Sequence, residues 1–223
     1  IDILLTNNQL SNNNYINTQQ NEKNLAAYFS SQYRSKKFLI KSVLRKEWHS
    51  NFNIPFIPTL AFESKLSNLV IFKARFNRNF RAPTFNDRYW AGEGANGNVN
   101  LKPEDAWNRE IGLDINIKSL KISVTGYNLN ISDMILWQQI ESEIWIPNNI
   151  QKVFSRGIET KMIFKFKELS FDGHYAYTIS TNESAANSLD NSIGKQLRYV
   201  PLHKANARFT AENEKTTFSI HTS

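Results

Sequence analysis

Residues 69–85 read LVIFKARFNRNFRAPTF, and this stretch decides the fold. From Val70 to Phe76 every second residue is apolar, and Lys73, Arg75 and Asn77 occupy positions of the other parity. Successive side chains of a β-strand point to opposite faces of the sheet. The stretch therefore predicts a strand that has one apolar and one polar face.

A second strand of the same character follows after a long loop, residues 81–106. In this strand Leu113, Ile115 and Ile117 alternate with polar neighbours. The same period of two recurs in segments 25–33, 37–48, 54–66, 120–131, 158–167, 169–179 and 204–211. With a short apolar run at 1–5 and a last start at 218–220, the chain is predicted to form about eleven antiparallel strands.

The parity of the strand over 120–131 slips by one residue at Gly126. Beyond it Tyr127, Leu129 and Ile131 would continue the apolar face that Leu120, Ile122 and Val124 begin. A glycine at a one-residue slip is typical of a β-bulge, so we expect a bulge at Gly126.

The predicted connections alternate in length. Short turns fall near residues 35–36, 65–68, 118–119, 167–168 and 213–215, and long loops at 7–22, 81–106, 138–147 and 183–198, with a shorter excursion at 49–53. Transmembrane barrels of the outer membrane have short periplasmic turns and longer external loops. A soluble β-sandwich has no reason to gather its long loops at one end. The alternation therefore favours a barrel wall over a sandwich.

Aromatic residues support the same reading. Trp48, Trp137, Trp145 and Tyr199 fall near the expected outer ends of strands, where barrels carry an interfacial girdle of aromatic side chains. The alternative is that these are core or loop aromatics of a soluble β domain.

Composition excludes several classes of protein. The 223 residues carry a net charge of +7 and no cysteine, so disulfides, thiolate metal sites and cysteine nucleophiles are excluded. The basic residues are spread along strands and form no run that marks a nucleic-acid groove. No apolar stretch approaches the roughly 20 residues of a membrane-spanning helix. Because the chain opens at Ile1 without a start methionine or export signal, we expect it to be a piece of a longer protein.

Several sequence motifs occur in a fixed order. They are an aromatic-Arg-Ala-Pro segment, a loop rich in Gly and Asn, an Asn-Leu-Lys-Pro-Glu turn and a Glu-x-Gly strand. The motif residues are Phe80, Arg81, Ala82, Pro83, Thr84 and Phe85, then Asn100, Leu101, Lys102, Pro103 and Glu104. Further along, the segments 156–159 (RGIE) and 200–203 (VPLH) resemble two strand motifs of the same family. The order resembles the signature of TonB-dependent outer-membrane receptors, within their C-terminal barrel.

This resemblance implies an all-β fold, an antiparallel up-and-down transmembrane β-barrel of 22 strands. Residues 1–223 would be part of the barrel domain and would supply about eleven of those strands. The family also has an N-terminal plug domain and a short box that binds TonB. Plug, box and last strands are all expected to lie outside this sequence.

The resemblance is strongest to transporters of cobalamin and siderophores. It implies energy-coupled import of cobalamin or a ferric siderophore across the outer membrane of a Gram-negative bacterium. The expected partners are TonB, through the N-terminal part, the small-molecule substrate, and outer-membrane lipid or lipopolysaccharide. Relatives that import glycans would add a surface lipoprotein. A soluble or surface carbohydrate-binding β-sheet module remains an alternative from another class.

Substrate contact is expected from the outer loops. The candidates are Asn86, Asp87, Arg88, Tyr89 and Trp90, and secondarily Trp137 and Trp145. Arg81, Pro83 and Thr84 are expected to shape the loop, because proline fixes its own φ and favours an extended residue before it.

The polar face of the wall is expected to line an aqueous lumen with an excess of positive charge. Its basic residues include Lys73, Arg75, Lys161, Lys165 and Arg208. Such a passage would attract anionic ligands, although the same cations could pair with carboxylates of a plug domain or with lipopolysaccharide phosphates.

Catalysis finds no support in the residues. The four histidines lie far apart and have no spacing of metal ligands. His174 and Asp172 share a strand face simply by geometry. No phosphate-binding loop or nucleophile elbow is present. We therefore expect no enzyme activity, no bound metal and no cofactor.

Overall fold

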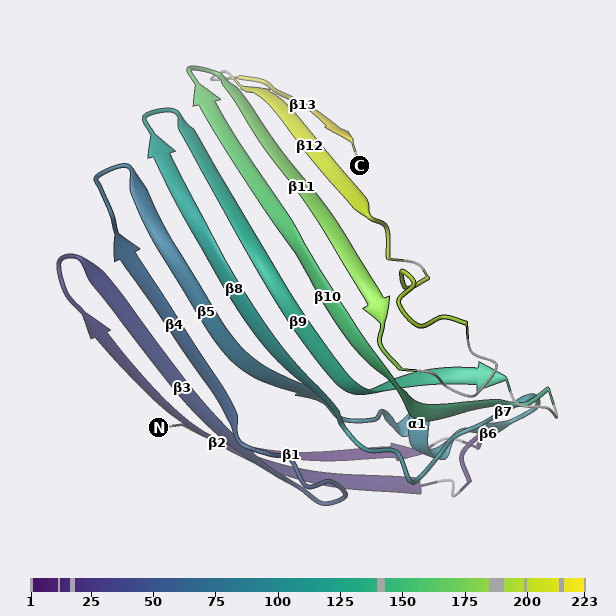
Figure 1. Cartoon of the computed structure of the whole chain (residues 1–223). Helices are drawn as coiled ribbons and strands as arrows, with labels where there is room; N and C mark the ends of the chain where they lie inside the picture. The colour runs from purple at the N-terminus through teal and green to yellow at the C-terminus, as the bar shows by residue number, and fades with distance from the viewer. Residues whose placement is uncertain are drawn as a thin grey trace.

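One antiparallel sheet makes up nearly the whole molecule (Figure 1). The structure, a computed structural model, describes residues 2–11, 13–16, 19–139, 143–184, 191–198, 200–212 and 215–222. Its long strands are β1 (Asp2–Ser11), β2 (Gln19–Arg34), β3 (Phe38–His49), β4 (Ile57–Lys65), β5 (Val70–Arg81), β8 (Glu104–Ile117), β9 (Leu120–Gln139), β10 (Trp145–Phe166), β11 (Leu169–Asn182), β12 (His203–Glu212) and β13 (Thr217–Thr222).

The strands pair in chain order, each with the one before and the one after it. The loop from β5 to β8 holds a helix, α1 (Phe85–Tyr89), and the two-residue strands β6 (Ala91–Gly92) and β7 (Ala95–Asn96). Without β6 and β7, the 13 described strands leave an up-and-down path of eleven, as predicted. β1 and β13 are the two edges of this path, so the sheet is an open, partial barrel.

The two ends of the wall differ. In Figure 1 the turns joining β2 to β3, β4 to β5, β8 to β9 and β10 to β11 lie at one end, and α1, β6 and β7 lie at the other. The turn predicted at 213–215 falls largely outside the described residues. The separation of short turns from long loops is confirmed for the described connections.

The strand register separates an apolar from a polar face. One row across the wall joins Phe72, Leu113, Val124, Thr160 and Tyr175 through successive pairings. Leu113 is 40% exposed and Tyr175 42% exposed, so these side chains cover the surface of the sheet and are not buried together in a core. The residues of this row, apolar or aromatic except Thr160, define one face of the sheet, which we call the apolar face.

Buried apolar side chains gather at the loop end of the wall. Leu101 lies in the loop before β8, Ile135 and Val153 lie near the loop ends of β9 and β10, and Ile54 lies between β3 and β4. Tyr15, from the β1–β2 connection, is also buried. Much of the buried apolar surface therefore lies where the loops contact the wall, and Leu39 and Ala176 are buried within the wall itself.

The bulge predicted at Gly126 is wrong. β8 and β9 pair without a register shift from Ile117 opposite Leu120 to Asp105 opposite Ser132. Tyr127 consequently lies on the polar face, where its hydroxyl is 2.7 Å from the Thr178 hydroxyl. The register shifts occur instead nearer the loop end, in the pairing of β9 with β10 on both sides of Gln151.

Two of the predicted loops are shorter than expected. β1 and β2 pair as far as Ser11 opposite Gln19, which turns much of the predicted loop 7–22 into strand. Likewise β9 and β10 pair as far as Gln139 opposite Trp145, within the predicted loop 138–147. A tilted strand needs only about 9 to 11 residues to cross a membrane. β10 has 22 residues, so its backbone pairing extends well beyond that length.

The predicted aromatic girdle is only partly visible. Trp48 and Trp145 are exposed near the loop ends of β3 and β10, and Trp137 turns toward the loop. Tyr199 lies outside the described residues. In the part of the chain that is described, no helix is long and apolar enough to cross a membrane.

Candidate functional site

The loop of residues 82–103, which we call the anchored loop, begins with a capped turn of helix. Thr84 is the N-cap of α1: its Oγ1 accepts a hydrogen bond from the Asp87 N–H at 3.1 Å. In return the Asp87 carboxylate accepts from the Thr84 N–H at 2.9 Å. This reciprocal capping satisfies donors that a helix start would otherwise leave free.

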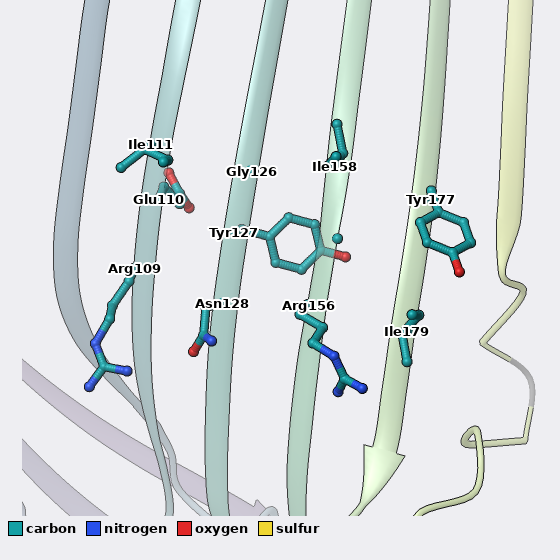
Figure 2. A pocket seen from close by; sticks show the side chains of 11 residues that line it. Arg109, Glu110, Ile111, Gly126, Tyr127, Asn128, Arg156, Ile158, Tyr177 and Ile179 are labelled. Carbon is teal, nitrogen blue, oxygen red and sulfur yellow. The ribbon is translucent and has the colours of Figure 1, made fainter.

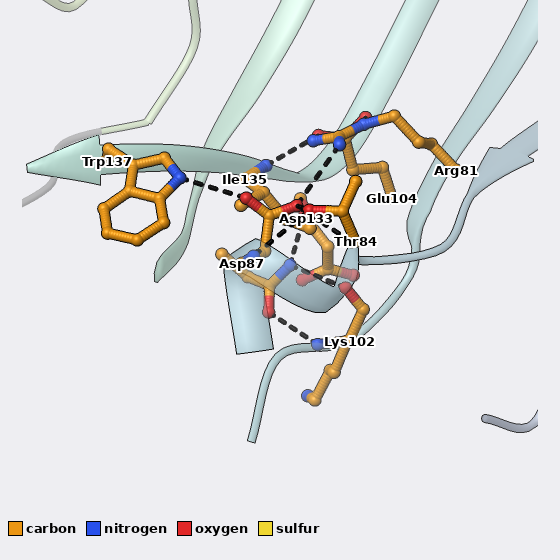
Figure 3. A network of polar contacts seen from close by, with 9 residues as sticks. Arg81, Thr84, Asp87, Lys102, Glu104, Asp133, Ile135 and Trp137 are labelled. Carbon is orange, nitrogen blue, oxygen red and sulfur yellow. Dashed lines mark hydrogen bonds and ion pairs between the residues drawn. The ribbon is translucent and has the colours of Figure 1, made fainter. Parts of the chain in front are cut away.

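Asp87 joins the helix to the wall. Its carboxylate accepts a hydrogen bond from the Trp137 indole N–H on β9 at 3.0 Å, and the Arg81 guanidinium lies 3.6 Å away (Figure 3). Burial favours the neutral acid, but the hydrogen bonds from Thr84 and Trp137 and the charge of Arg81 outweigh it, so the pKa of Asp87 is lowered. The group therefore stays ionised although it is only 7% exposed.

Glu104, the last residue of the Asn-Leu-Lys-Pro-Glu turn, closes the far side of this network. Its carboxylate takes both a 2.9 Å and a 2.5 Å hydrogen bond from Arg81, in a bidentate arrangement. The Ile135 N–H of β9 donates to the same carboxylate at 2.8 Å. Figure 3 shows the two ends of the anchored loop meeting here against β9.

Asparagines near the start of β10 bind the returning part of the loop. Asn149 accepts from the Lys102 N–H at 2.7 Å and donates to the carbonyls of Lys102 and Asp133 at 2.9 and 2.7 Å. Asn98 donates to the Pro147 carbonyl and to the Asn148 side chain, both at 3.1 Å. The loop is thus bonded to strands far from it in the sequence.

β2, β3 and the connection from β1 to β2 hold the opposite flank. The Arg88 guanidinium donates to the Glu22 carboxylate at 2.5 Å, and both side chains are buried. His49 of β3 lies 3.7 Å from the same carboxylate. The Tyr15 hydroxyl donates to the Asn86 side chain at 2.6 Å. A buried ion pair of this kind fixes a position because losing one partner leaves an uncompensated charge.

Glycine allows the loop to fold back closely on α1. A Cβ at Gly97 would lie 2.6 Å from the Arg88 carbonyl carbon, closer than real Cβ atoms approach. The Gly97 N–H donates to the Trp90 carbonyl at 2.7 Å. Here the glycine serves close backbone packing, and no phosphate cradle is built around it.

The predicted substrate-contact residues divide into two groups. Asp87 and Arg88 are each 7% exposed and are occupied by the bonds just described. Asn86 is exposed, Tyr89 and Trp90 are half-buried, and Trp145 is 47% exposed where β10 pairs with β7. The anchored loop therefore presents aromatic and amide groups from a rigidly held base.

The predicted lumen residues share the polar face, and several are paired there. Lys73 forms an ion pair with Asp114, Arg75 lies 3.8 Å from Glu110, and Lys161 lies 3.8 Å from Asp172. Within the described part of the chain, Lys165 and Arg208 take part in no ion pair within 4 Å. The excess of positive charge is thus partly neutralised by neighbouring strands.

The possible metal ligands among the described residues are His, Asp and Glu side chains. Among the described residues, no group of three or more His, Asp or Glu side chains could hold a metal ion.

The motif residues stand out in the sequence, but the side chains that form hydrogen bonds and ion pairs with the anchored loop do not. Glu22 and Asn149 come from distant segments, and only the register of the wall brings them to the loop. One local signal was available for α1: the Thr84-x-x-Asp87 spacing is that of a reciprocal helix cap.

Comparisons with known proteins agree with this geometry. Residues 3–219 match the family described as TonB dependent receptor-like, beta-barrel. The vitamin B12 transporter BtuB of Photobacterium profundum is 31% identical over 178 residues, covering 78% of this chain and 28% of that protein. BtuB of Vibrio vulnificus (strain YJ016) is 31% identical over 153 residues, covering 68% and 24%.

A solved structure shares the fold. The siderophore receptor PirA from Pseudomonas aeruginosa matches 99% of this chain and 41% of its own, with a TM-score of 0.78 at 16% identity. The chain spans 28% or less of the curated relatives named above. Because the family match extends over nearly the whole sheet, this chain belongs to the TonB-dependent receptor family, as part of its β-barrel.

Proposed function

We propose that this chain is part of the wall of an outer-membrane transporter of a Gram-negative bacterium. Residues 1–223 would belong to the barrel domain, with a plug domain and further strands supplied elsewhere in the full-length receptor. The apolar face would meet lipid and the polar face would line the passage. The loop end would face outward, because barrels of this kind keep their long loops outside.

The proposed cargo is a scarce chelate or cofactor, either cobalamin or a ferric siderophore. The observation that carries this proposal is the anchored loop, a built and rigid base that presents exposed groups at the loop end of a receptor barrel. Relatives named as vitamin B12 transporters are 31% identical to this chain over the matched residues, and a siderophore receptor has the same fold. The receptor would bind and move its cargo without changing a covalent bond in it.

Contacts to cargo are proposed for the exposed part of the loop end. Trp145, Trp90 and Asn86 would touch the ligand, because large aromatic groups give much contact area for little entropy. Asp87, Arg88 and Trp137 would hold the loop in place. Lys165 and Arg208, for which the described residues offer no ion pair, would add an attractive field for anionic cargo in the passage.

Energy is proposed to come through TonB, bound by the N-terminal part of the full-length receptor. An uptake assay tests cargo and energy source together. A strain lacking the gene should lose import of either radiolabelled cobalamin or a ferric siderophore. The gene should restore that import only when TonB is present. Unchanged import of both compounds in the deletion strain would contradict the proposal.

The loop assignment has its own test. In the full-length receptor, Trp145→Ala should weaken cargo binding by about tenfold or more, the usual size of a central aromatic contact. Glu93→Ala is the matched control, because Glu93 is an exposed side chain of the anchored loop, which Trp145 contacts by pairing with Ala95. Equal affinity of both variants would remove Trp145 from the binding site.

A further inference from the structure

A hollow of about 500 Å³ interrupts the apolar face between β8 and β11 (Figure 2). Its floor is at Gly126, where the row of side chains formed by Ile111, Ile158 and Tyr177 has a gap. A Cβ at Gly126 would have no neighbour closer than 4.0 Å, so the hollow is open space and not a close packing of strands.

The rim of the hollow carries two arginines. Arg109 of β8 and Arg156 of β10 stand in the next row toward the loops, with Asn128 of β9 between them. Figure 2 shows the three residues in one row below Ile111 and Ile158, with the Arg109 side chain directed toward β5 and the Arg156 side chain toward β11. Since neighbouring strands lie about 4.8 Å apart, the two arginine Cα atoms are separated by roughly 10 Å.

Neither arginine is neutralised by the wall. Among the described residues, no ion pair within 4 Å includes Arg109 or Arg156. Arg109 stands over the Phe76 ring, and Arg156 over Phe154, where it also reaches the Thr181 hydroxyl at 3.4 Å. Glu110 points to the other face, toward Arg75. Two cations therefore border an apolar hollow without a carboxylate between them.

The position of the row of Arg109, Asn128 and Arg156 along the strands indicates where it would lie in the membrane. The segment from Arg109 to the turn at Ile117 holds nine residues, as does that from Leu120 to Asn128. A tilted strand crosses the hydrocarbon layer in about 9 to 11 residues. If the turn end lies at one boundary of the membrane, as in the proposed function, the arginines lie at the other boundary.

We propose that this hollow binds a phosphorylated glycolipid of the outer leaflet, with one acyl chain over Gly126 and its phosphate groups at Arg109 and Arg156. The proposal rests on the outward orientation of the loops given under the proposed function. Guanidinium groups bind phosphate through paired hydrogen bonds. The apolar walls at Ile111 and Ile158, which are 63% and 52% exposed, fit a hydrocarbon chain.

Native mass spectrometry of the full-length receptor in detergent, titrated with diphosphoryl lipid A, tests the proposal. Wild type should retain the lipid, and the double variant Arg109→Ala, Arg156→Ala should bind it at least about tenfold more weakly, because charge-assisted hydrogen bonds are lost. The corresponding double lysine variant should keep most of the binding. Gly126→Ile, which fills the hollow, should also weaken it.

Arg75→Ala is the matched control, since Arg75 is an exposed arginine of the polar face, and its affinity should equal that of wild type. Equal binding by wild type and the double alanine variant would overturn the proposal. So would equally tight binding of phosphatidylglycerol, or a dimer that only the wild type forms. Fractionation of the same cells separates the two hypotheses: a receptor absent from the outer membrane contradicts the proposed function, whereas one present there with unchanged lipid binding contradicts only the lipid site.

Discussion

At the scale of single residues, Asp87 links the helix cap, the wall and the turn at the start of β8. Its carboxylate receives donors from Thr84 and Trp137, and it shares Arg81 with Glu104. Each donor compensates part of the cost of burying a charge. The anchored loop therefore depends on Asp87 being ionised.

Acid should loosen the anchored loop. The folded pKa of Asp87 lies below its ordinary value of 3.8, so its stabilising contribution is complete above that value and is lost as pH falls through the folded pKa. Hydrogen exchange of residues 84–90 in the full-length receptor, corrected for intrinsic rates, should show less protection below about pH 4 than at pH 6. Asp87→Asn should abolish this pH dependence, and the same pH response in that variant would contradict the assignment.

Glu104 offers a second test at this scale. Glu104→Ala removes the partner of Arg81 and of the Ile135 N–H, so the free energy of local opening should fall by about 1 to 2 kcal/mol. Because Arg81 is half exposed, water screens part of the ion pair. Hydrogen exchange at Ile135 measures the effect, with Glu93→Ala as control. Equal protection in both variants would mean that the bidentate pair is not needed.

At the scale of elements, the glycines of β9 and β10 have opposite roles. A Cβ at Gly157 would collide with the Tyr177 carbonyl oxygen and lie 2.8 Å from the Tyr127 hydroxyl, whereas one at Gly126 meets open space. Gly157 thus permits close approach of β11 and Tyr127, and Gly126 leaves a gap on the surface.

These two glycines make a matched pair of variants. Gly157→Ala should destabilise the folded full-length receptor by about 1 to 3 kcal/mol, since the backbone must shift to accept the methyl group. Gly126→Ala should change stability by less than about 0.5 kcal/mol. Urea unfolding in detergent micelles, followed by tryptophan fluorescence, measures both. Equal destabilisation would contradict the register between β9, β10 and β11.

The strands could be predicted from the sequence because, along most of the wall, apolar and polar residues alternate as the side chains alternate between the two faces of the sheet. The prediction from parity failed at Gly126. Tyr127, Leu129 and Ile131 are aromatic or apolar, yet the unshifted register places them on the polar face. Near the loop end the polar face is no longer uniformly polar, because Val153, which pairs with Ile131, is buried there. No slip of register occurs between Leu120 and Ile131, so the parity of β9 is unchanged there.

The site was predicted only in part. Motif residues such as Thr84 and Glu104 stand out locally, because proline and capping chemistry act over a few residues. Their partners Glu22 and Asn149 are ordinary polar residues whose role exists only once β2 and β10 stand beside the loop. Long-range pairing of this kind leaves no periodic signal in the sequence.

At the scale of the whole molecule, the chain is a two-faced wall with free edges at β1 and β13. An isolated open sheet of this size would expose unpaired backbone groups at both edges. Membrane barrels avoid this cost by closure, since lipid cannot satisfy backbone donors and acceptors. We therefore propose that these strands belong to a closed barrel in the full-length receptor.

The central claim is that one face meets lipid and the other meets water. The 223 residues contain no cysteine, so single cysteines can be placed at Val124 and Thr125, on opposite faces of β9. In a full-length receptor without other cysteines, reconstituted in liposomes, spin labels at these sites report accessibility to oxygen and to a water-soluble nickel complex. The account predicts that oxygen relaxes the label at 124 more strongly and nickel the label at 125. Equal accessibility to nickel at both sites would contradict it.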